Sequence, residues 1–126
     1  MGEMFSFEKL LVWQKSMKFA NNIVEVAENL NSPKQHYRLV EQIEACSVSV
    51  PQNIAEGSGC WSVKEYIHFL YIARGSLYEC ITLITLFQQR KWISAETENN
   101  LKTQALEIAK MLNALIGSLK QSTPAS

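Results

Sequence analysis

The fold is decided by residues 61–91, which read WSVKEYIHFLYIARGSLYECITLITLFQQRK. Apolar side chains recur there at alternating three- and four-residue steps, which places them on one face of a helix. The members of this stripe are Tyr66, Leu70, Ala73, Leu77, Cys80, Ile84 and Phe87. A heptad rhythm of this length predicts a long helix at about 63–90 that packs against other helices.

The start of this segment carries two helix-initiation signals. Ser62 and Glu65 have the spacing of a capping box, in which each side chain accepts a hydrogen bond from the other residue's backbone N–H. Trp61 and Tyr66 have the spacing of a hydrophobic staple across the same turn. Two cations follow the last apolar position, where positive charge suits the negative end of the helix dipole.

Three further segments have the same periodicity and are separated by short breaks. We expect Ser6, Ser32 and Ser94 as their N-caps, because serine oxygens accept hydrogen bonds from the free N–H groups of a first turn. Pro51 lies inside the second segment and predicts a kink or a break there, because proline lacks a backbone donor. The expected helices and the polar, frayed tail are at about 7–30, 33–56, 63–90, 95–120 and 121–126.

The fold class follows from these lengths and connections. Four helices of similar length joined by short connections favour an antiparallel up-down-up-down bundle. No segment alternates between apolar and polar residues as a half-buried strand does. The sequence therefore predicts an all-α, antiparallel up-down-up-down four-helix bundle, formed by a single domain over residues 1–126.

Composition narrows the class of protein. Twelve Lys and Arg residues balance twelve acidic residues among 126, so the formal net charge is zero. A net charge of zero excludes a strongly cationic nucleic-acid binder, but it is compatible with a local basic patch. The cysteines Cys46, Cys60 and Cys80 show no C-x-x-C spacing, which is typical of reduced, core-filling thiols in a cytoplasmic protein. The sequence shows no signal peptide and no apolar run of membrane-spanning length, so no membrane partner is expected.

Residue types needed for catalysis are sparse. His36 and His68 lie on different predicted helices, and the chain has no Asp to orient either of them. Glu65-x-x-His68 has the spacing of a ligand pair in di-iron bundles, but the second such pair is missing. The Gly-Ser-Gly stretch at 57–59 lacks the other residues of a phosphate-binding loop and is interpreted as a helix stop. We therefore expect a protein without catalytic residues, metal or cofactor.

Residues 49–57, SVPQNIAEG, carry a more specific signal. They resemble the S-I-P-x-N-I-A-E-G signature of the four-helix-bundle family named for 23S ribosomal RNA intervening-sequence proteins. Residues 64–70, KEYIHFL, and 73–79, ARGSLYE, are similar to that family's K-E-F-x-x-F-L and A-x-G-S-x-x-E stretches. Residues 11–15, LVWQK, resemble its L-x-V-W-Q/K opening, so the resemblance extends over nearly the whole chain.

This resemblance implies a small bacterial four-helix protein that forms a homo-oligomer, since homopentameric barrels are among the structurally known relatives. It also implies kinship with the accessory variability proteins of diversity-generating retroelements, which are similar bundles that bind nucleic acid and a reverse transcriptase. The biochemical role of the intervening-sequence branch is largely undefined, and a shared fold does not transfer a function. RNA or DNA binding through an assembled surface is the function expected at the level of the family.

The cations available for binding phosphate lie mainly on the second and third helices. Relatives often carry an Arg-Arg pair where this chain has Glu44 and Ala45, and a basic residue where it has Cys60. Because affinity for a phosphate backbone comes mostly from Lys and Arg, these differences weaken the nucleic-acid hypothesis. The remaining candidate contacts are Lys34, Arg38, Lys64, Arg74, Arg90 and Lys91.

The other family-motif residues are interpreted as structural. Gly75 is expected to allow close approach of another helix, because glycine inside a helix otherwise costs about 1 kcal/mol relative to alanine. Asn53 and Glu56 are expected to bond backbone groups that Pro51 frees. Bonding to Ser76 across the bundle and a surface contact site are the alternatives for this pair. The full set is Pro51, Asn53, Glu56, Gly57, Glu65, Gly75, Ser76 and Glu79.

Assembly into an oligomer is also expected from the residues themselves. Four large apolar side chains lie beside their own helical stripes, namely Phe69, Ile72, Leu83 and Trp92. Such surplus apolar surface is often buried by a partner subunit. A ring of subunits repeats a weak basic patch, so zero net charge per chain does not exclude nucleic-acid binding. The alternative function is a protein-interaction scaffold or accessory subunit without nucleic-acid binding.

Overall fold

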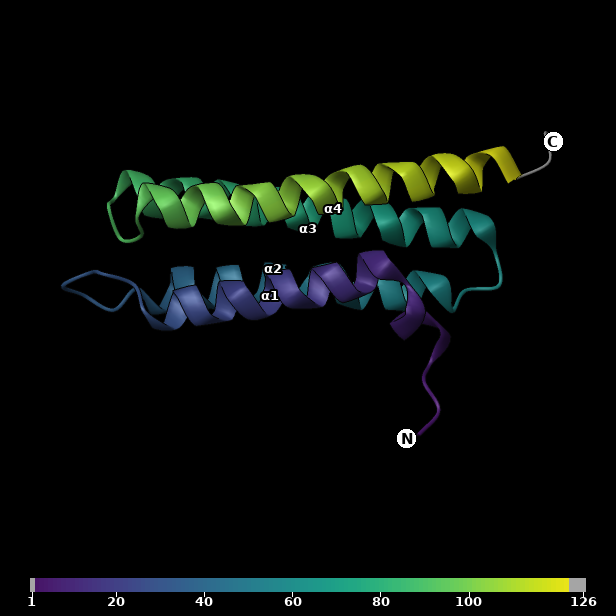
Figure 1. Cartoon of the computed structure of the whole chain (residues 1–126), viewed down its shortest axis with the longest axis horizontal. Coiled ribbons are helices and arrows are strands. Elements are labelled where there is room, and N and C mark those ends of the chain that lie inside the picture. The colour runs from purple at the N-terminus through teal and green to yellow at the C-terminus, as the bar shows by residue number, and fades with distance from the viewer. Residues whose placement is uncertain (1, 123–126) are drawn as a thin grey trace.

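A computed structural model describes residues 2–122, which form four α-helices and one short 3₁₀ turn (Figure 1). The elements are η1 (Ser6–Lys9), α1 (Leu11–Glu28), α2 (Tyr37–Ser58), α3 (Val63–Gln89) and α4 (Ala95–Ser122). Within the described residues no strand occurs. The predicted all-α class is therefore confirmed.

The four helices form a bundle in which consecutive helices run in opposite directions (Figure 1). Each helix packs against its two neighbours in a closed order, because α1 also contacts α4. Among the described residues, the diagonal pairs α1–α3 and α2–α4 do not approach within 8 Å between Cα atoms. The interface between α2 and α3 is the most extensive of the four. This is the predicted four-helix bundle.

The core lies along the axis of the bundle and is built from all four helices. The apolar periodicity of residues 63–90 is confirmed, because its positions from Leu70 to Phe87 are fully buried and Tyr66 is partly buried. The largest fully buried side chains are Phe19, Phe87, Ile23, Ile43, Ile54, Leu70, Leu77, Ile84, Ile108, Leu112, Val50 and Cys80. Removing such apolar surface from water is the main favourable contribution to the stability of the fold.

The first helix begins later than predicted. Ser6 opens the separate turn η1, and the extended residue Leu10 lies between this turn and α1. The carboxylate of Glu8 accepts the backbone N–H of Phe5 at 2.8 Å, which holds the turn closed. The prediction that Ser6 caps a helix from residue 7 is wrong, because a local acceptor stabilises a turn that α1 does not continue.

The second helix also begins later, at residue 37 instead of 33. Ser32, the predicted N-cap, bonds His36 through Oγ and Nε2 at 2.9 Å. The His36 ring stacks on Trp92 at 4.0 Å between centroids, and the backbone N–H of Asn31 donates to the Trp92 carbonyl at 2.9 Å. The predicted cap is wrong, because the segment before α2 packs against the α3–α4 connection instead of winding into a first turn.

Neither Pro51 nor Gly57 interrupts α2, which runs as one helix to Ser58. Of the predicted kink or break at Pro51, the break is therefore wrong. The helix does end within the Gly-Ser-Gly stretch at 57–59, as predicted, with Ser58 as its last residue and Gly59 as its C-cap. Gly57 is buried against α3, where an added Cβ would lie 2.9 Å from Cβ of Phe69 and 3.0 Å from the Tyr66 ring. The glycine is needed for the close approach of two helices and not for a turn.

Two of the predicted N-caps form. Ser62 Oγ accepts the backbone N–H of Glu65 at 3.1 Å, and Ser94 Oγ accepts that of Thr97 at 3.0 Å. These bonds satisfy donors that the first turns of α3 and α4 leave free. The predicted staple is wrong, because Trp61 is fully exposed to solvent.

The fourth helix extends two residues into the predicted frayed tail, as far as Ser122. Residues 123–126 of that predicted tail lie outside the described residues. By length and composition alone, α3 is the one described helix that meets the requirements for crossing a membrane. The core helices of soluble bundles meet the same requirements, and α3 packs along α2 and α4.

Candidate nucleic-acid interface

Four of the six candidate phosphate contacts lie at one end of the bundle. Lys34 and Arg38 lie in and just after the α1–α2 connection, and Arg90 and Lys91 lie at the end of α3. We call residues 29–38 and 90–94 together the loop end. The two segments are joined by the hydrogen bond and the ring stack that tie Asn31 and His36 to Trp92.

Trp92 is the anchor of the loop end. It is buried, and its ring lies 5.4 Å from that of Phe87 at the end of the core and 4.0 Å from that of His36. The guanidinium carbon of Arg90 lies 6.0 Å from the centre of the same ring, at the limit of a cation–π contact. An aromatic stack therefore joins the two connections that carry the cations.

The backbone at Lys91 is in a conformation that favours glycine, with φ of 62°. Its N–H donates to the Gln88 carbonyl at 2.8 Å, and the N–H of Trp92 donates to the Phe87 carbonyl at 2.9 Å. Together with the Phe87–Trp92 ring contact, these bonds form a Schellman motif that ends α3. A side chain in this left-handed region is unfavourable by about 1 kcal/mol or more, so a lysine lies where glycine is the more stable choice.

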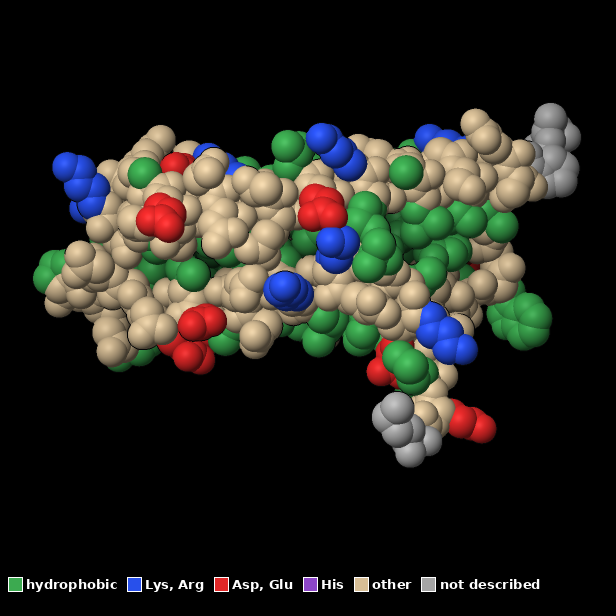
Figure 2. All heavy atoms as spheres, in the orientation of Figure 1, with side chains coloured by type: hydrophobic (Ala, Val, Ile, Leu, Met, Phe, Trp, Pro, Cys, Tyr) green, Lys and Arg blue, Asp and Glu red, His purple; other side chains and the backbone are tan. Residues whose placement is uncertain are grey.

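The loop-end cations have no carboxylate partner within the described residues. The two ion pairs of the described chain lie elsewhere. They join Lys15 to Glu107 at 2.7 Å and Lys102 to Glu98 at 3.0 Å. The surroundings are nevertheless mixed in charge, because Glu28 lines the same hollow as Lys34. Figure 2 shows the same mixture over the face of α1 and α4, where basic and acidic side chains alternate.

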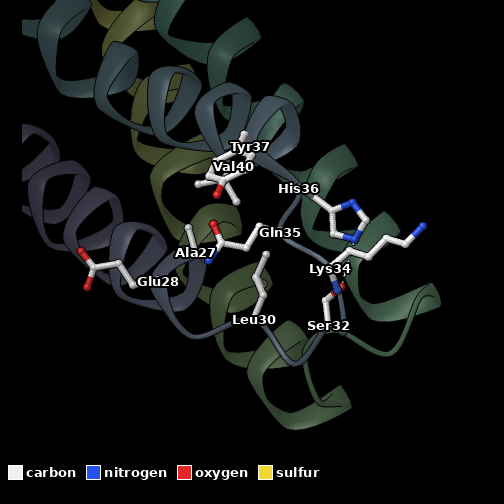
Figure 3. Close-up of a pocket in the computed structure, with 9 residues that line it drawn as sticks. All are labelled: Ala27, Glu28, Leu30, Ser32, Lys34, Gln35, His36, Tyr37 and Val40. Carbon is white, nitrogen blue, oxygen red and sulfur yellow. Dashed lines mark hydrogen bonds between the residues drawn. The ribbon is translucent and has the colours of Figure 1, made fainter.

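A hollow of about 350 Å³ opens beside the α1–α2 connection (Figure 3). The stick view shows the Lys34 side chain extending away from the bundle past the His36 ring. The lining residues are Ala27, Glu28, Leu30, Ser32, Lys34, Gln35, His36, Tyr37 and Val40. The hollow is open to solvent and contains one lysine and one glutamate, so it is not an electropositive cradle by itself.

The other two candidate contacts lie elsewhere. Lys64 is in the first turn of α3, at the opposite end of the bundle. Arg74 is in the middle of α3, where its Nη1 donates to Oδ1 of Asn113 in α4 at 2.8 Å. Its guanidinium also lies 4.8 Å from the centre of the Tyr71 ring, and the ammonium of Lys120 lies 5.4 Å from the same centre.

Lys120 and Arg74 thus form a second, smaller group of cations beside Tyr71. The sequence predicted Arg74 as a contact but not Lys120. The missing signal is the pairing of α3 with α4, which brings residues 74 and 120 to one aromatic ring.

The residues considered as metal ligands do not converge. Glu65 and His68 are both exposed on α3, and His68 lies edge-on to its neighbour Phe69 at 5.9 Å between centroids. No group of three or more His, Cys or acidic residues that could hold a metal ion exists among residues 2–122. The Glu-x-x-His pair therefore has no further ligand in the described part of the chain.

The polar motif residues of α2 form a bridge to α3. The Asn53 amide donates to the carbonyl of Ser49 at 2.8 Å and to its Oγ at 2.9 Å, and that Oγ bonds Oγ of Ser76 at 2.8 Å. Asn53 thus reaches Ser76 through Ser49 and does not bond the carbonyl of residue 47 that Pro51 frees. The Glu56 side chain is exposed and lines an open hollow with Phe7, which leaves it available for a surface contact.

Gly75 has a different environment from the one predicted. No atom of the described chain outside its own helix turn lies within 4 Å of a Cβ built there, so the close approach does not occur within the chain. Gly75 lies in a stripe on the solvent side of α3 that we call the outer face. Its members are Tyr71, Ile72, Gly75, Tyr78, Glu79, Thr82 and Leu86, all of them exposed.

The surplus apolar side chains divide between core and surface. Leu83 and Trp92 are buried within the chain, so the prediction that they remain for a partner is wrong. Phe69 is half-buried against Gly57, whereas Ile72 is 39% exposed on the outer face. Of the predicted partner-binding positions, Ile72 is therefore the one that the fold leaves open.

Comparison with known proteins identifies the family of the chain. The family model described as 23S rRNA-intervening sequence protein matches residues 8–114. A crystal structure of a protein of unknown function from the S23 ribosomal protein family of Bacteroides thetaiotaomicron superposes with a TM-score of 0.79 and 26% identity, covering 84% of this chain and 98% of that one. A search of curated proteins finds no match. With most of its length matched by the family model, the chain belongs to the 23S rRNA-intervening sequence protein family.

Proposed function

We propose that this protein is a non-enzymatic homo-oligomer that binds RNA or DNA through the loop-end cations of several subunits. One observation carries the proposal: Lys34, Arg38, Arg90 and Lys91 come from separate connections to one end of the bundle and have no carboxylate partner in the described chain. Cations without a carboxylate partner, gathered at one end of the molecule, are available to bind a phosphate backbone. The family description, which names 23S rRNA, favours RNA as the first ligand to test.

The conformation of Lys91 supports the same assignment. Its backbone occupies a region in which glycine avoids the steric penalty, yet the chain places a cation there. The Schellman motif needs only the backbone of this residue, so the side chain contributes nothing to ending the helix. A functional cation accounts for a residue that the fold itself does not favour.

Assembly is needed because one chain presents a weak site. The net charge is zero, and two glutamates next to the loop end share surface hollows with its cations, Glu28 with Lys34 and Glu41 with Arg38. Repeating the patch around a ring raises the effective affinity without any new contact. The outer face of α3 is the surface we assign to assembly, because it combines exposed Ile72, Tyr78 and Leu86 with an open glycine. Five subunits in the cytoplasm is the assembly to test first.

The binding proposal is tested with charge-reversal variants of equal charge. The test variant carries Lys34→Glu, Arg90→Glu and Lys91→Glu, and the control carries three reversals of exposed lysines away from the loop end. Those control positions are Lys9, Lys18 and Lys110. Binding of a structured RNA and of a duplex DNA is measured across a salt series, with the melting temperature recorded for each variant.

We expect the loop-end variant to lose at least tenfold in affinity and to show a shallower salt dependence, by about 0.9 in log–log slope on duplex DNA for each lost phosphate contact. The control variant should bind within about threefold of the wild type, since it changes net charge equally. Equal losses in both variants would show that the loop end is not the site. No binding by the wild type at low salt would reject nucleic-acid binding altogether.

The assembly proposal is tested separately by native mass. Ile72→Glu and Gly75→Arg should each release monomers with unchanged helical circular dichroism, because they place charge and bulk on the outer face. Leu106→Glu changes another exposed apolar residue, on α4, and serves as the matched control. A wild-type chain that is monomeric at high concentration contradicts the proposal directly.

One observation favours the alternative function, a protein-interaction scaffold. Trp61 is fully exposed in the α2–α3 connection, and Phe5 is 73% exposed in the segment before η1. Exposed aromatic residues are common anchors of protein interfaces. If RNA and DNA fail to bind while Trp61→Ala abolishes a protein complex isolated with the wild type, the scaffold function replaces the nucleic-acid one.

A further inference from the structure

Two of the three cysteines meet inside the α2–α3 interface. Sγ of Cys46 in α2 lies 3.1 Å from Sγ of Cys80 in α3, and both residues are buried. The separation exceeds the roughly 2.05 Å of a disulfide bond by only about 1 Å. Forming the bond therefore requires the two sulfur atoms to approach by only this distance.

The hydrogen bonds of the pair make its two members chemically unequal. Cys46 donates its S–H to the Ile43 carbonyl at 3.4 Å, so the S–H of Cys80 is left to donate to Cys46 Sγ. Because that S–H stabilises negative charge on its neighbour, it lowers the pKa of Cys46, whereas bonding to Cys46 raises the pKa of Cys80. Cys46 is the thiol that ionises first, and Cys80 is placed directly against it.

We propose that Cys46 and Cys80 form a reversible disulfide that links α2 to α3 when the protein meets hydrogen peroxide. The inference does not depend on nucleic-acid binding or on assembly. Both partners belong to one chain, and both are buried in the interface between α2 and α3, away from the exposed outer face.

The chemistry balances with peroxide as the oxidant. The Cys46 thiolate attacks one oxygen of hydrogen peroxide, which breaks the O–O bond, forms the sulfenic acid of Cys46 and releases hydroxide. The Cys80 sulfur then attacks the sulfenic sulfur, and water leaves as the S–S bond forms. In total two thiols lose two hydrogens, and one peroxide becomes two water molecules. A thiol reductant reverses the bond by exchange.

Burial controls the rate of this reaction. Cys46 is 5% exposed and Cys80 is 0% exposed, so a large disulfide reagent cannot reach either sulfur in the folded chain. Hydrogen peroxide is small enough to enter during local opening of the interface. We therefore expect oxidation by peroxide to be faster than oxidation by oxidised glutathione, because only the smaller oxidant reaches the buried sulfur atoms.

The bond is expected to stabilise the bundle. It closes a loop that contains the α2–α3 connection and so restricts the unfolded chain. For a domain of this size, we expect the melting temperature of the oxidised protein to rise by roughly 5 to 15 °C.

The experiment uses the Cys60→Ala variant, which removes the third thiol. Cys60 lies at the α2–α3 connection, and its Sγ donates to the Glu56 carbonyl at 3.4 Å instead of contacting another sulfur. The folded variant is treated with hydrogen peroxide, and its remaining thiols are counted after unfolding in denaturant. The matched control carries both Cys60→Ala and Cys80→Ala and retains Cys46 alone.

We expect the Cys60→Ala variant to lose both thiols and two hydrogens in mass, to remain one chain on a non-reducing gel and to recover both thiols with reductant. The control should show Cys46 sulfenic acid, trapped by a dimedone probe, and no loss of two hydrogens. Peptide mapping of oxidised wild-type protein without reduction should join the Cys46 and Cys80 peptides, which tests the bond without any substitution. Retention of both thiols, cross-links only between chains, or a lower melting temperature after oxidation would overturn the proposal.

Discussion

The two sides of α3 contrast sharply in how their residues are used. On the side facing α2, Gly57 makes room for Phe69, and the Ser49–Ser76 and Cys46–Cys80 pairs meet at 2.8 Å and 3.1 Å. On the outer face, Gly75 has nothing within 4 Å of its missing Cβ, and the neighbouring Ile72 is 39% exposed. Both glycines belong to the family-motif stretches of the sequence.

The difference teaches that two glycines of the same family motifs can be required for two different reasons. Gly57 is explained completely by the packing of one chain, because any side chain there meets atoms of α3. Gly75 is not explained by the single chain, since glycine in an exposed helix is destabilising by about 1 kcal/mol. We assign the inner side to folding and the outer face to assembly.

The largest expected effect is on the inner side. Leu77→Ala removes a fully buried side chain from α3 and should lower the free energy of unfolding by about 3 kcal/mol, because it leaves a cavity in the core. Urea denaturation monitored by circular dichroism measures the change. A loss below about 1 kcal/mol would mean that the helices are packed more loosely around α3 than the structure shows.

A smaller loss is expected at the close helix approach. Gly57→Ala places a methyl group 2.9 Å from Cβ of Phe69 and 3.2 Å from the Tyr66 carbonyl, and neither atom is the end of a flexible side chain. The clash outweighs the helix propensity gained. The free energy of unfolding of the variant should therefore be about 1 to 2 kcal/mol lower than that of the wild type. An increase in stability would remove the distinction between the two glycines.

The opposite sign is expected on the outer face. Gly75→Ala should raise the free energy of unfolding of the dissociated chain by about 1 kcal/mol, because the methyl group enters open space and the helix propensity improves. The measurement is made by urea denaturation at a protein concentration low enough to give a monomeric native mass. The same variant should associate more weakly at high concentration, and unchanged association would argue against close approach by a second subunit.

The smallest effect on stability is expected at Ile72. Ile72→Ala should change the free energy of unfolding of the monomer by no more than about 0.5 kcal/mol, since the side chain lies on the surface. Its effect should appear instead in analytical ultracentrifugation, as a weaker association constant. A large loss of monomer stability would show that Ile72 belongs to the core, and the comparison of the two faces would need revision.

Much of the fold was predictable because helix periodicity is a local property. The stripe from Tyr66 to Phe87 identified the buried side of α3, and Ser62 and Ser94 identified two helix starts. The failures at Ser6 and Ser32 have one cause. A serine caps a helix only if the residues after it wind into the first turn, and here Glu8 and Trp92 provide competing contacts.

Less of the candidate site was predictable. The sequence identified the cations but could not group them, since Lys34 and Lys91 are brought to the same end by two connections far apart in the chain. It predicted Cys46 and Cys80 as core-filling thiols without revealing that they meet. Positions along a helix axis depend on how one helix is shifted against the next, which periodicity does not encode.

The sequence by itself determined the number of helices, their order and the apolar side of each, because these follow from the spacing of residues along one chain. The tertiary structure alone decided where α1 and α2 begin, which glycine lies between helices and which cations share an end. The physical reason is that these features depend on contacts between segments distant in sequence. The rotation and axial shift of each helix set those contacts, and both are fixed only when the side chains interlock in the core.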